Sequence, residues 1–413
     1  MAEEAKFGAS GRPGIRKFLR AGHTIILLGT GGVGKTTVAG ALGIAAAEAG
    51  IRTGVITIDP ARRLRDALGL RRLGDRPTRI EARRLARAGL DPRLELFAMV
   101  LDVRRQWDAM VDRLVSDRAA RATIRKNRFY RRLAGQLAGS DAYAALEALH
   151  DLHETERFGV AIVDTPPAAH AFDFIQAPGR MARLLDSGAA RLFSSAAVIP
   201  GSSLALGFAG RAARRVIDEL ERFTGIETLS SIAEFFSAAA SASNALIDRF
   251  RKAEAMLRGP TVHFVIVTTA EPDRLNHARE LMGELRSAGL APAAIVINRF
   301  LDPEAWEARG TTSGASTPAA LRSAANHDPE LRAALEHLEK YRRGLNAAAA
   351  RVADFARELP GPMALAAAPA LSGAAADLAA LRTIGAYLSG GKTPQAAEHA
   401  MRLHRRRSRR EPE

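Results

Sequence analysis

Cysteine is absent from this 413-residue chain, aromatic residues make up only 5% of it, and long apolar runs are missing. The absence of cysteine excludes a disulfide framework, a thiolate metal site and a cysteine nucleophile. No run approaches the ~18 apolar residues that a membrane span needs. The first twenty residues are mixed and charged, without the apolar core of a secretory signal. We therefore expect a cytoplasmic protein.

Lysine is scarce, supplying only 7 of the 60 basic residues, yet the formal net charge is +15. Such a charge is common among nucleic-acid binders. Arginine beside abundant alanine also fits the coding bias of a GC-rich genome, so charge alone does not identify a partner. Residues 61–150 hold 21 basic and 11 acidic residues, a net +10. Three interpretations stay open for this region: a solvated surface, attraction to anionic lipid, or a docking face for an acidic partner.

Short apolar segments alternate with helical ones along much of the chain, which predicts an α/β fold with a mostly parallel sheet. The predicted strands are 23–28, 53–58, 158–163, 262–267 and 293–297, and the clearest helices are 36–50 and 273–288. Helical insertions are expected at about 80–157, 180–257 and 316–358, all within one domain spanning 21–400. Residues 1–20 form a basic extension, and residues 401–413 a basic tail that we expect to be disordered or partner-bound.

A glycine-rich segment follows the first predicted strand and precedes the first predicted helix. It reads Gly29-Thr30-Gly31-Gly32-Val33-Gly34-Lys35-Thr36-Thr37, which contains the phosphate-loop pattern G-x4-G-K-[ST]. Glycines let successive backbone N–H groups converge on phosphate oxygens, and the helix N-terminus adds partial positive charge. In this pattern the lysine reaches the β and γ phosphates, and the following threonine hydroxyl ligates Mg2+. The sequence therefore predicts a nucleotide site at residues 29–37.

Two aspartates follow consecutive predicted strands. Asp164 precedes a Thr-Pro-Pro turn, at a strand end where it can hold Mg2+ through water or simply form the turn. Asp59 precedes Pro60, and its carboxylate can either orient the attacking water or cap the next helix. Thr36, Asp59 and Asp164 are the candidate Mg2+ positions. Spacing alone leaves the role of Asp59 open.

The motifs together resemble the ArsA/Get-type family of ATPases, and most closely its bacterial single-unit members. The matching stretches are GTGGVGKTT (29–37), TIDPARRLRDALG (57–69), NRFYRRLAGQLAGSDAYAALEALHDLHE (127–154), VDTPPAAHAFDFIQAP (163–178), ARRVIDELERFTG (213–225), FVIVTTAEPDRL (264–275) and VINRF (296–300). This resemblance covers about residues 22–390. It implies a homodimeric, Mg2+-dependent P-loop ATPase that couples ATP hydrolysis to movement of a helical subdomain.

The resemblance also implies roles for individual residues. Asp59 falls on the switch I aspartate that positions water, and Asp164 on the switch II aspartate. Asn298 matches the asparagine that reads the adenine edge, and Pro369 lies in the loop that packs against adenine. His170 falls on the switch II histidine and Glu271 on a glutamate that approaches nucleotide across the dimer. Catalysis is accordingly expected from Asp59 and Lys35.

The sequence departs from the family pattern in three ways, and each departure changes what we expect of the protein. Thr30 stands where the family usually has a lysine that reaches into the partner's active site, so slower or differently gated turnover is expected. The chain has one phosphate loop instead of a tandem pair. Without cysteine it can form neither the family's thiolate metalloid site nor its zinc-bridged dimer. Arsenite transport is therefore not expected.

We expect a protein cargo or a membrane partner, which the sequence does not name, and nucleic acid is not expected. Apolar spacing at Leu101, Trp107, Met110, Val111 and Leu114 favours a packed helical core over a cargo groove. The apolar, Gly- and Ser-broken segment 193–210 is a candidate lid or cargo contact. Two other classes stay open: a MinD/ParA-like positioning switch that binds membrane or DNA, and a pseudo-ATPase subunit paired with a paralogue in a heterodimer.

Overall fold

A computed structural model gives the architecture of the chain. It describes residues 14–58, 63–134, 148, 158–166, 231, 234–235, 237–239, 242–301, 319–361, 363–371 and 377–390. Asp59, His170, the segment 193–210 and the tail 401–413 lie outside these residues.

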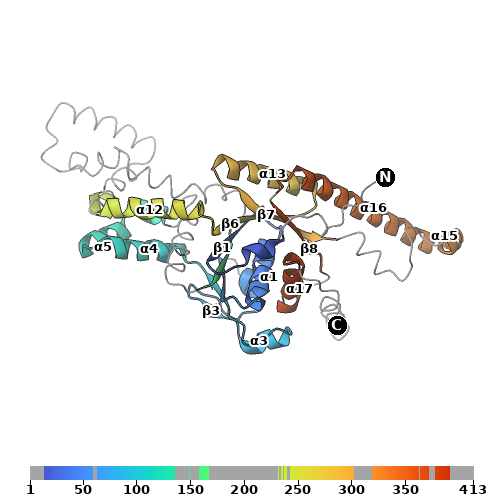
Figure 1. Cartoon of the computed structure of the whole chain (residues 1–413), viewed down its shortest axis with the longest axis horizontal. Helices are drawn as coiled ribbons and strands as arrows, with labels where there is room; N and C mark the ends of the chain where they lie inside the picture. The colour runs from blue at the N-terminus through green and yellow to red at the C-terminus, as the bar shows by residue number, and fades with distance from the viewer. Residues whose placement is uncertain are drawn as a thin grey trace, which may run out of the picture.

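An eight-stranded sheet forms the centre of the described part (Figure 1), in the order β3-β4-β2-β5-β1-β6-β7-β8. All neighbouring strands pair in parallel except β3 and β4, which are antiparallel. The strands are β1 (His23–Leu28), β2 (Thr53–Thr57), β3 (Thr78–Arg79), β4 (Leu96–Val100), β5 (Val160–Asp164), β6 (Val262–Thr268), β7 (Pro292–Phe300) and β8 (Ala364–Pro369). The predicted α/β fold with a mostly parallel sheet is confirmed.

Helices cover both faces of this sheet. The short helix η1 (Ile15–Phe18) precedes β1, and the described α-helices are α1 (Lys35–Glu48), α2 (Arg63–Ala67), α3 (Ala82–Arg87), α4 (Val103–Leu114), α5 (Arg118–Lys126), α6 (Arg128–Leu133), α12 (Ser243–Leu257), α13 (Pro272–Ser287), α15 (Ala319–Ala325), α16 (Pro329–Glu358) and α17 (Leu378–Leu388). In Figure 1, α13 and α16 lie above β6, β7 and β8, and α1 and α17 lie below these strands. None of the helices in the described part combines the length and apolar character that a bilayer span requires.

The side-chain alternation of β1 explains this layering. Ile25 and Leu27 belong to the apolar cluster that includes α1 and α17, whereas Ile26 and Leu28 belong to the cluster with α4, α12 and α13. All four side chains are fully buried, as expected for a central parallel strand that is covered on both faces. The sheet is therefore buried on both faces and supports the described loops at its edges.

One prediction about the insertions is wrong in part. Residues 80–157 were expected to be helical, but Leu96–Val100 forms β4 and pairs with β2 deep in the sheet. Helix α4 begins only at Val103. The strand escaped prediction because a five-residue apolar run inside an arginine-rich segment fits a strand and a buried helical turn equally well. Its pairing with β2 is a long-range contact that decides between the two.

Helices α4, α5 and α12 project to one side of the sheet (Figure 1). Trp107, Met110 and Val111 of α4 are buried, and the Trp107 ring lies 6.3 Å from that of Phe250 in α12. The predicted packed helical core is confirmed for these α4 residues and for Leu101, which is also buried. Phe97 and Met99, counted with the helical insertion by sequence, belong to β4 instead.

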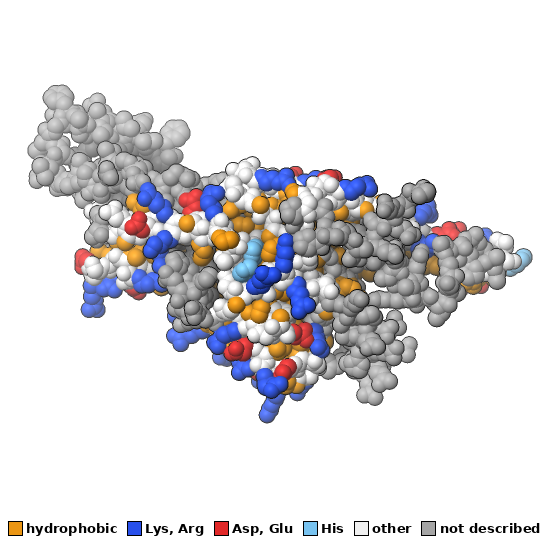
Figure 2. Space-filling model, viewed as in Figure 1, with side chains coloured by type: hydrophobic (Ala, Val, Ile, Leu, Met, Phe, Trp, Pro, Cys, Tyr) orange, Lys and Arg blue, Asp and Glu red, His pale blue; other side chains and the backbone are white. Residues whose placement is uncertain are grey.

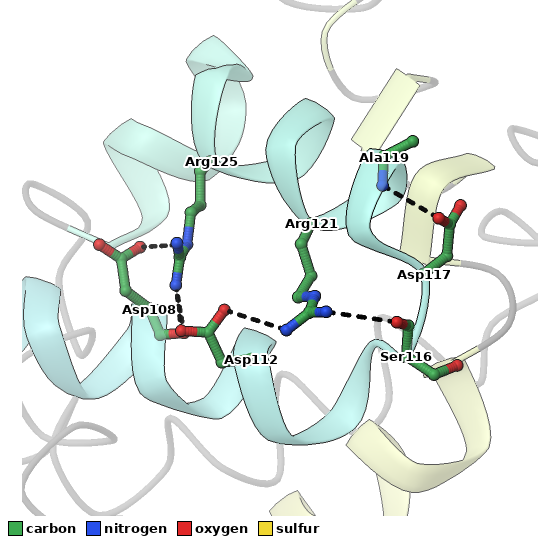
Figure 3. A network of polar contacts seen from close by, with 7 residues as sticks. All are labelled: Asp108, Asp112, Ser116, Asp117, Ala119, Arg121 and Arg125. Atoms are coloured by element: carbon green, nitrogen blue, oxygen red, sulfur yellow. Dashed lines mark hydrogen bonds and ion pairs between the residues drawn. The ribbon is translucent and has the colours of Figure 1, made fainter.

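Ion pairs link the exposed sides of α4 and α5 (Figure 3). Arg125 of α5 forms a close ion pair with Asp112 of α4, and Arg121 reaches the same carboxylate at 3.8 Å. Asp108 accepts a hydrogen bond from the buried Tyr130 hydroxyl at 2.8 Å. The aspartates of α4 thereby orient the two following helices, and part of the positive charge of this region is compensated internally.

Candidate functional site

The glycine-rich segment forms a loop between β1 and α1, at the carboxyl edge of the sheet. A Cβ atom on Gly29 would lie 2.4 Å from the Val267 carbonyl oxygen of β6, so a side chain has no room there. Gly34 adopts a left-handed φ of +91°, and a Cβ on it would lie 2.1 Å from Asn298 Nδ2. Helix α1 begins at the next residue, Lys35. The backbone N–H groups of its first turn therefore adjoin the loop, as anion binding requires.

Lys35 folds back over the loop from the first turn of α1. Its ammonium donates hydrogen bonds to the carbonyl oxygens of Gly29, at 2.8 Å, and Thr30, at 3.2 Å. The residue is only 7% exposed. From this position the ammonium can transfer its hydrogen bonds to β and γ phosphate oxygens.

Helix α1 and the strands β2 and β5 bring side-chain oxygens together beside this lysine. The hydroxyl of Thr36 donates to Asp164 Oδ2 at 2.6 Å, and the hydroxyl of Thr57 donates to the same oxygen at 3.2 Å. Asp164 is the last residue of β5 and is 1% exposed. Its carboxylate is therefore fixed between α1 and β2 by two neutral donors.

This donor set fits Mg2+. Hydroxyl and carboxylate oxygens are hard ligands, and Mg2+ is commonly bound by one or two such groups plus substrate phosphates and water. Within the described residues, no three His, Asp or Glu side chains gather in a metal-holding group. A cation here would thus depend on Thr36 and Asp164 together with nucleotide oxygens.

Asn298 and Pro369 lie at the carboxyl ends of the neighbouring strands β7 and β8. The Asn298 side chain is buried, and its Nδ2 group donates to the Val33 carbonyl oxygen at 2.8 Å. Pro369 pairs in register with Phe300 and is half-buried. Asn298 therefore supports the phosphate loop directly, while its expected reading of an adenine edge stays a prediction.

Of the other predicted residues, the structure describes Glu271 but not Asp59 or His170. Glu271 is the exposed residue preceding α13, and its carboxylate accepts a close hydrogen bond from the Thr269 hydroxyl. Asp59 and His170 lie outside the described residues, although Ile58, directly before Asp59, is hydrogen-bonded to the Asp164 carbonyl at 3.1 Å. The structure therefore brings together four of the predicted site residues: Lys35, Thr36, Asp164 and Asn298.

Sequence reasoning missed several residues of this site. Thr57 holds Asp164, and the Thr165 hydroxyl donates to the Leu27 carbonyl at 2.6 Å, tying β5 to β1. Arg274, in the first turn of α13, donates to the Thr30 hydroxyl at 2.8 Å. The available signal was position alone: Thr57 and Thr165 lie at the carboxyl ends of predicted strands, and Arg274 lies at the start of the helix that follows the strand 262–267, where polar side chains gather in open α/β sheets.

A parallel sheet whose β1–α1 connection is a phosphate loop, with an aspartate ending the adjacent strand and bonded to the loop threonine, defines a P-loop nucleotide-binding protein. The sequence model of one family, described as anion-transporting ATPase, matches residues 23–312. The chain belongs to this family of ATP-binding P-loop ATPases, the same one that its motifs resemble.

Individual relatives agree with this assignment. The chain is 30% identical over 168 residues to a Halobacterium salinarum protein named for an arsenical pump-driving ATPase, a match that spans 40% of this chain and 25% of that protein. It is 25% identical to the ATPase asna-1 of Caenorhabditis elegans, over 70% of this chain and 77% of that one. It is 26% identical to the ATPase GET3 of Malassezia globosa, over 67% of this chain and 72% of that protein. The matches to the first relatives span less than half of those proteins' length.

Proposed function

We propose that this protein is a Mg2+-dependent ATPase that hydrolyses ATP to ADP and phosphate. We further propose that its nucleotide state moves the helical region formed by α4, α5, α6 and α12, which binds a protein cargo or membrane partner. The observation that carries this proposal is the position of Asp164, whose carboxylate joins the phosphate loop at Thr36 to the end of β2 at Thr57.

In the proposed hydrolysis, each group around the γ-phosphate has a defined role. Asp59 orients the water that attacks the γ phosphorus, the bond to the bridging oxygen breaks, and ADP and phosphate leave. Lys35 and the backbone N–H groups of the loop stabilise the charge that develops on the phosphate oxygens. Mg2+, when bound, neutralises charge on the β and γ oxygens. Thr36 and Asp164 would hold it.

A continuous apolar cluster supports coupling between this site and the helical region. It runs from Ile56 and Ile58, at the end of β2, to Trp107 of α4 and Phe250 of α12. Close-packed interiors shift between discrete arrangements instead of deforming gradually. A change at the end of β2 or β5 on hydrolysis therefore has a packed route to the helices that project from the sheet.

The surface of the helical region favours a partner with negative charge. Basic side chains mark the exposed face over α4 and α5 (Figure 2). Between residues 103 and 133, arginines and lysines exceed aspartates, and the aspartates at 108 and 112 already pair with Arg121 and Arg125. The remaining charge would attract an acidic protein segment or an anionic headgroup, with a strength that falls as salt rises.

The proposal is tested with two variants of the phosphate site. Lys35→Ala should abolish tight ATP binding, whereas Asp59→Asn should retain binding and lose hydrolysis. Hydrolysis is measured as phosphate release, and binding by fluorescence titration with a labelled nucleotide. Equal hydrolysis in Asp59→Asn and wild type would refute the role of Asp59. Absence of hydrolysis in the purified wild-type chain would favour a pseudo-ATPase subunit that needs a paralogue.

Partner binding is tested with the Asp59→Asn variant, which is expected to bind ATP without hydrolysing it. Asp59→Asn loaded with ATP should capture its partner more strongly than the ADP-loaded protein, and Lys35→Ala should capture it equally in both conditions. The purified protein is examined by light scattering for the expected homodimer. Salt-sensitive binding to DNA or anionic vesicles that appears only with ATP would instead favour the positioning-switch alternative.

A further inference from the structure

Arg274 places a second cation at the phosphate loop. Its guanidinium donates to the Thr30 hydroxyl at 2.8 Å, while the Thr30 carbonyl accepts from the Lys35 ammonium at 3.2 Å. One residue of the loop therefore holds both positive groups, one through its side chain and one through its backbone. Since the lysine of this motif reaches the β and γ phosphates, the arginine lies at the same end of the nucleotide site.

The position of Arg274 is set by backbone contacts on both sides. Pro272 starts α13, and the Thr268 hydroxyl at the end of β6 donates to the Arg274 carbonyl at 2.8 Å. Arg351 of α16 donates from Nε to the Ala270 carbonyl at 3.2 Å, which fixes the connection between β6 and α13. The arginine thus extends from a supported helix start and is half-buried.

The charge of Arg274 is not compensated by a carboxylate within the described part of the chain. Its hydrogen-bond partner is the neutral Thr30 hydroxyl, while the nearby Glu271 accepts from Thr269 and Asp273 is exposed. A partly buried guanidinium without a counter-ion is costly, and its planar fork of donors matches phosphate oxygens. An anion at the loop would supply the missing partner.

We propose that Arg274 is a specificity-determining residue that donates to the terminal phosphate of a nucleoside triphosphate, so that the site distinguishes ATP from ADP. This rests on the proposed function, because it takes ATP as the ligand. The Thr30 hydroxyl holds the guanidinium at the loop before the nucleotide enters. When ATP binds, the arginine exchanges this neutral acceptor for a charged one. ADP lacks the terminal phosphate and offers no such exchange.

The test compares ATP and ADP affinities for Arg274→Gln, which removes the charge but keeps an N–H donor for Thr30. Because hydrogen bonds to charged groups are the stronger kind, we expect ATP affinity to fall about tenfold or more and ADP affinity to change by less than about twofold. Arg274→Lys, which keeps the charge but not the fork, should show a smaller loss for ATP. Both nucleotides are titrated with and without Mg2+.

Arg351→Gln is the matched control, since it removes an arginine that supports the same connection from outside the site. It should leave the ratio of ATP to ADP affinity unchanged. If Arg274→Gln lowered the affinities for ATP and ADP equally, Arg274 would only support the loop. If neither affinity changed, contact between Arg274 and phosphate would be excluded. If wild type binds ATP without hydrolysing it, the proposed hydrolysis fails while the affinity ratio still tests Arg274.

Discussion

The Thr36 hydroxyl donates to the Asp164 carboxylate across 2.6 Å, so two of the three predicted Mg2+ positions, far apart in sequence, are directly hydrogen-bonded. Thr36 belongs to the first turn of α1, and Asp164 ends β5. The register of β1 beside β5, which places Leu27 opposite Asp164, brings them together. The bond orients the remaining lone pairs of both oxygens, so that they would offer a prepared pair of ligands to the proposed Mg2+.

Asp164→Asn should weaken Mg2+-dependent ATP binding while leaving metal-free binding nearly intact. Asparagine can still accept from Thr36, but it lacks the negative charge. Loss of such a supporting oxygen typically costs about 10- to 100-fold in metal affinity. The measurement is an Mg2+ titration of labelled-ATP fluorescence, with Asp66→Asn on the exposed face of α2 as control. An unchanged Mg2+ midpoint in Asp164→Asn would contradict the assignment.

Gly34→Ala should disable the phosphate loop for two separable reasons. The left-handed φ of +91° costs a non-glycine residue about 1–2 kcal/mol, and the added Cβ would collide with Asn298 Nδ2. We expect nucleotide binding to be lost in the single variant. In the double variant with Asn298→Ala, only the collision is relieved, so binding should return in part. Full binding in Gly34→Ala alone would show that the loop adapts without either cost.

Stability should fall at mildly acidic pH because of a histidine pair at the amino edge of the sheet. His263 Nε2 lies 2.8 Å from His23 Nδ1. Burial, followed by the charges of His23 and Lys17, lowers the pKa of His263 to about 4, and burial and Arg20 lower the pKa of His23. The unfolded chain, with histidine pKa values near 6.5, binds more protons between about pH 6.5 and 4. The free energy of unfolding is therefore highest above about pH 6.5, where the histidines are neutral in both states, and it declines as pH falls through this window.

The decline from pH 7 to pH 5 should be about 1 kcal/mol, after allowance for solvent screening at a half-buried site. His263→Gln removes the titrating ring and should flatten the pH dependence of urea unfolding. His337→Gln, at an exposed site on α16, should leave it unchanged. A wild-type unfolding free energy that does not vary across this range would disprove the prediction.

Asp108→Ala should destabilise the helical region by about 1–3 kcal/mol, because it leaves the Tyr130 hydroxyl buried without its acceptor. Burial, followed by the hydrogen bond to Asp108, raises the pKa of Tyr130, so the ring stays a neutral donor. The double variant with Tyr130→Phe should lose less than the sum of the two single variants, as urea unfolding would measure. Strict additivity would mean that the bond contributes nothing.

The phosphate loop and β1 could be predicted because their signals are local. Five of the eight strands were predicted within a few residues, since each is a short apolar run bounded by turn residues. β8 was missed because its alanine-rich sequence has little strand preference of its own. It is a strand only because its backbone pairs with β7. The antiparallel β3 has two residues and no sequence signal.

The sequence by itself determined the phosphate loop, because left-handed glycines, a buried lysine and a helix start are all encoded within nine residues. It also determined the family, through motifs spread along the chain. Tertiary structure alone decided which side chains meet that loop: Asp164, Arg274 and Asn298 reach it from β5, α13 and β7. Thr57 of β2 in turn holds Asp164. The physical reason is that parallel strands align their carboxyl ends at one edge, and the order of strands in the sheet is set by long-range pairing.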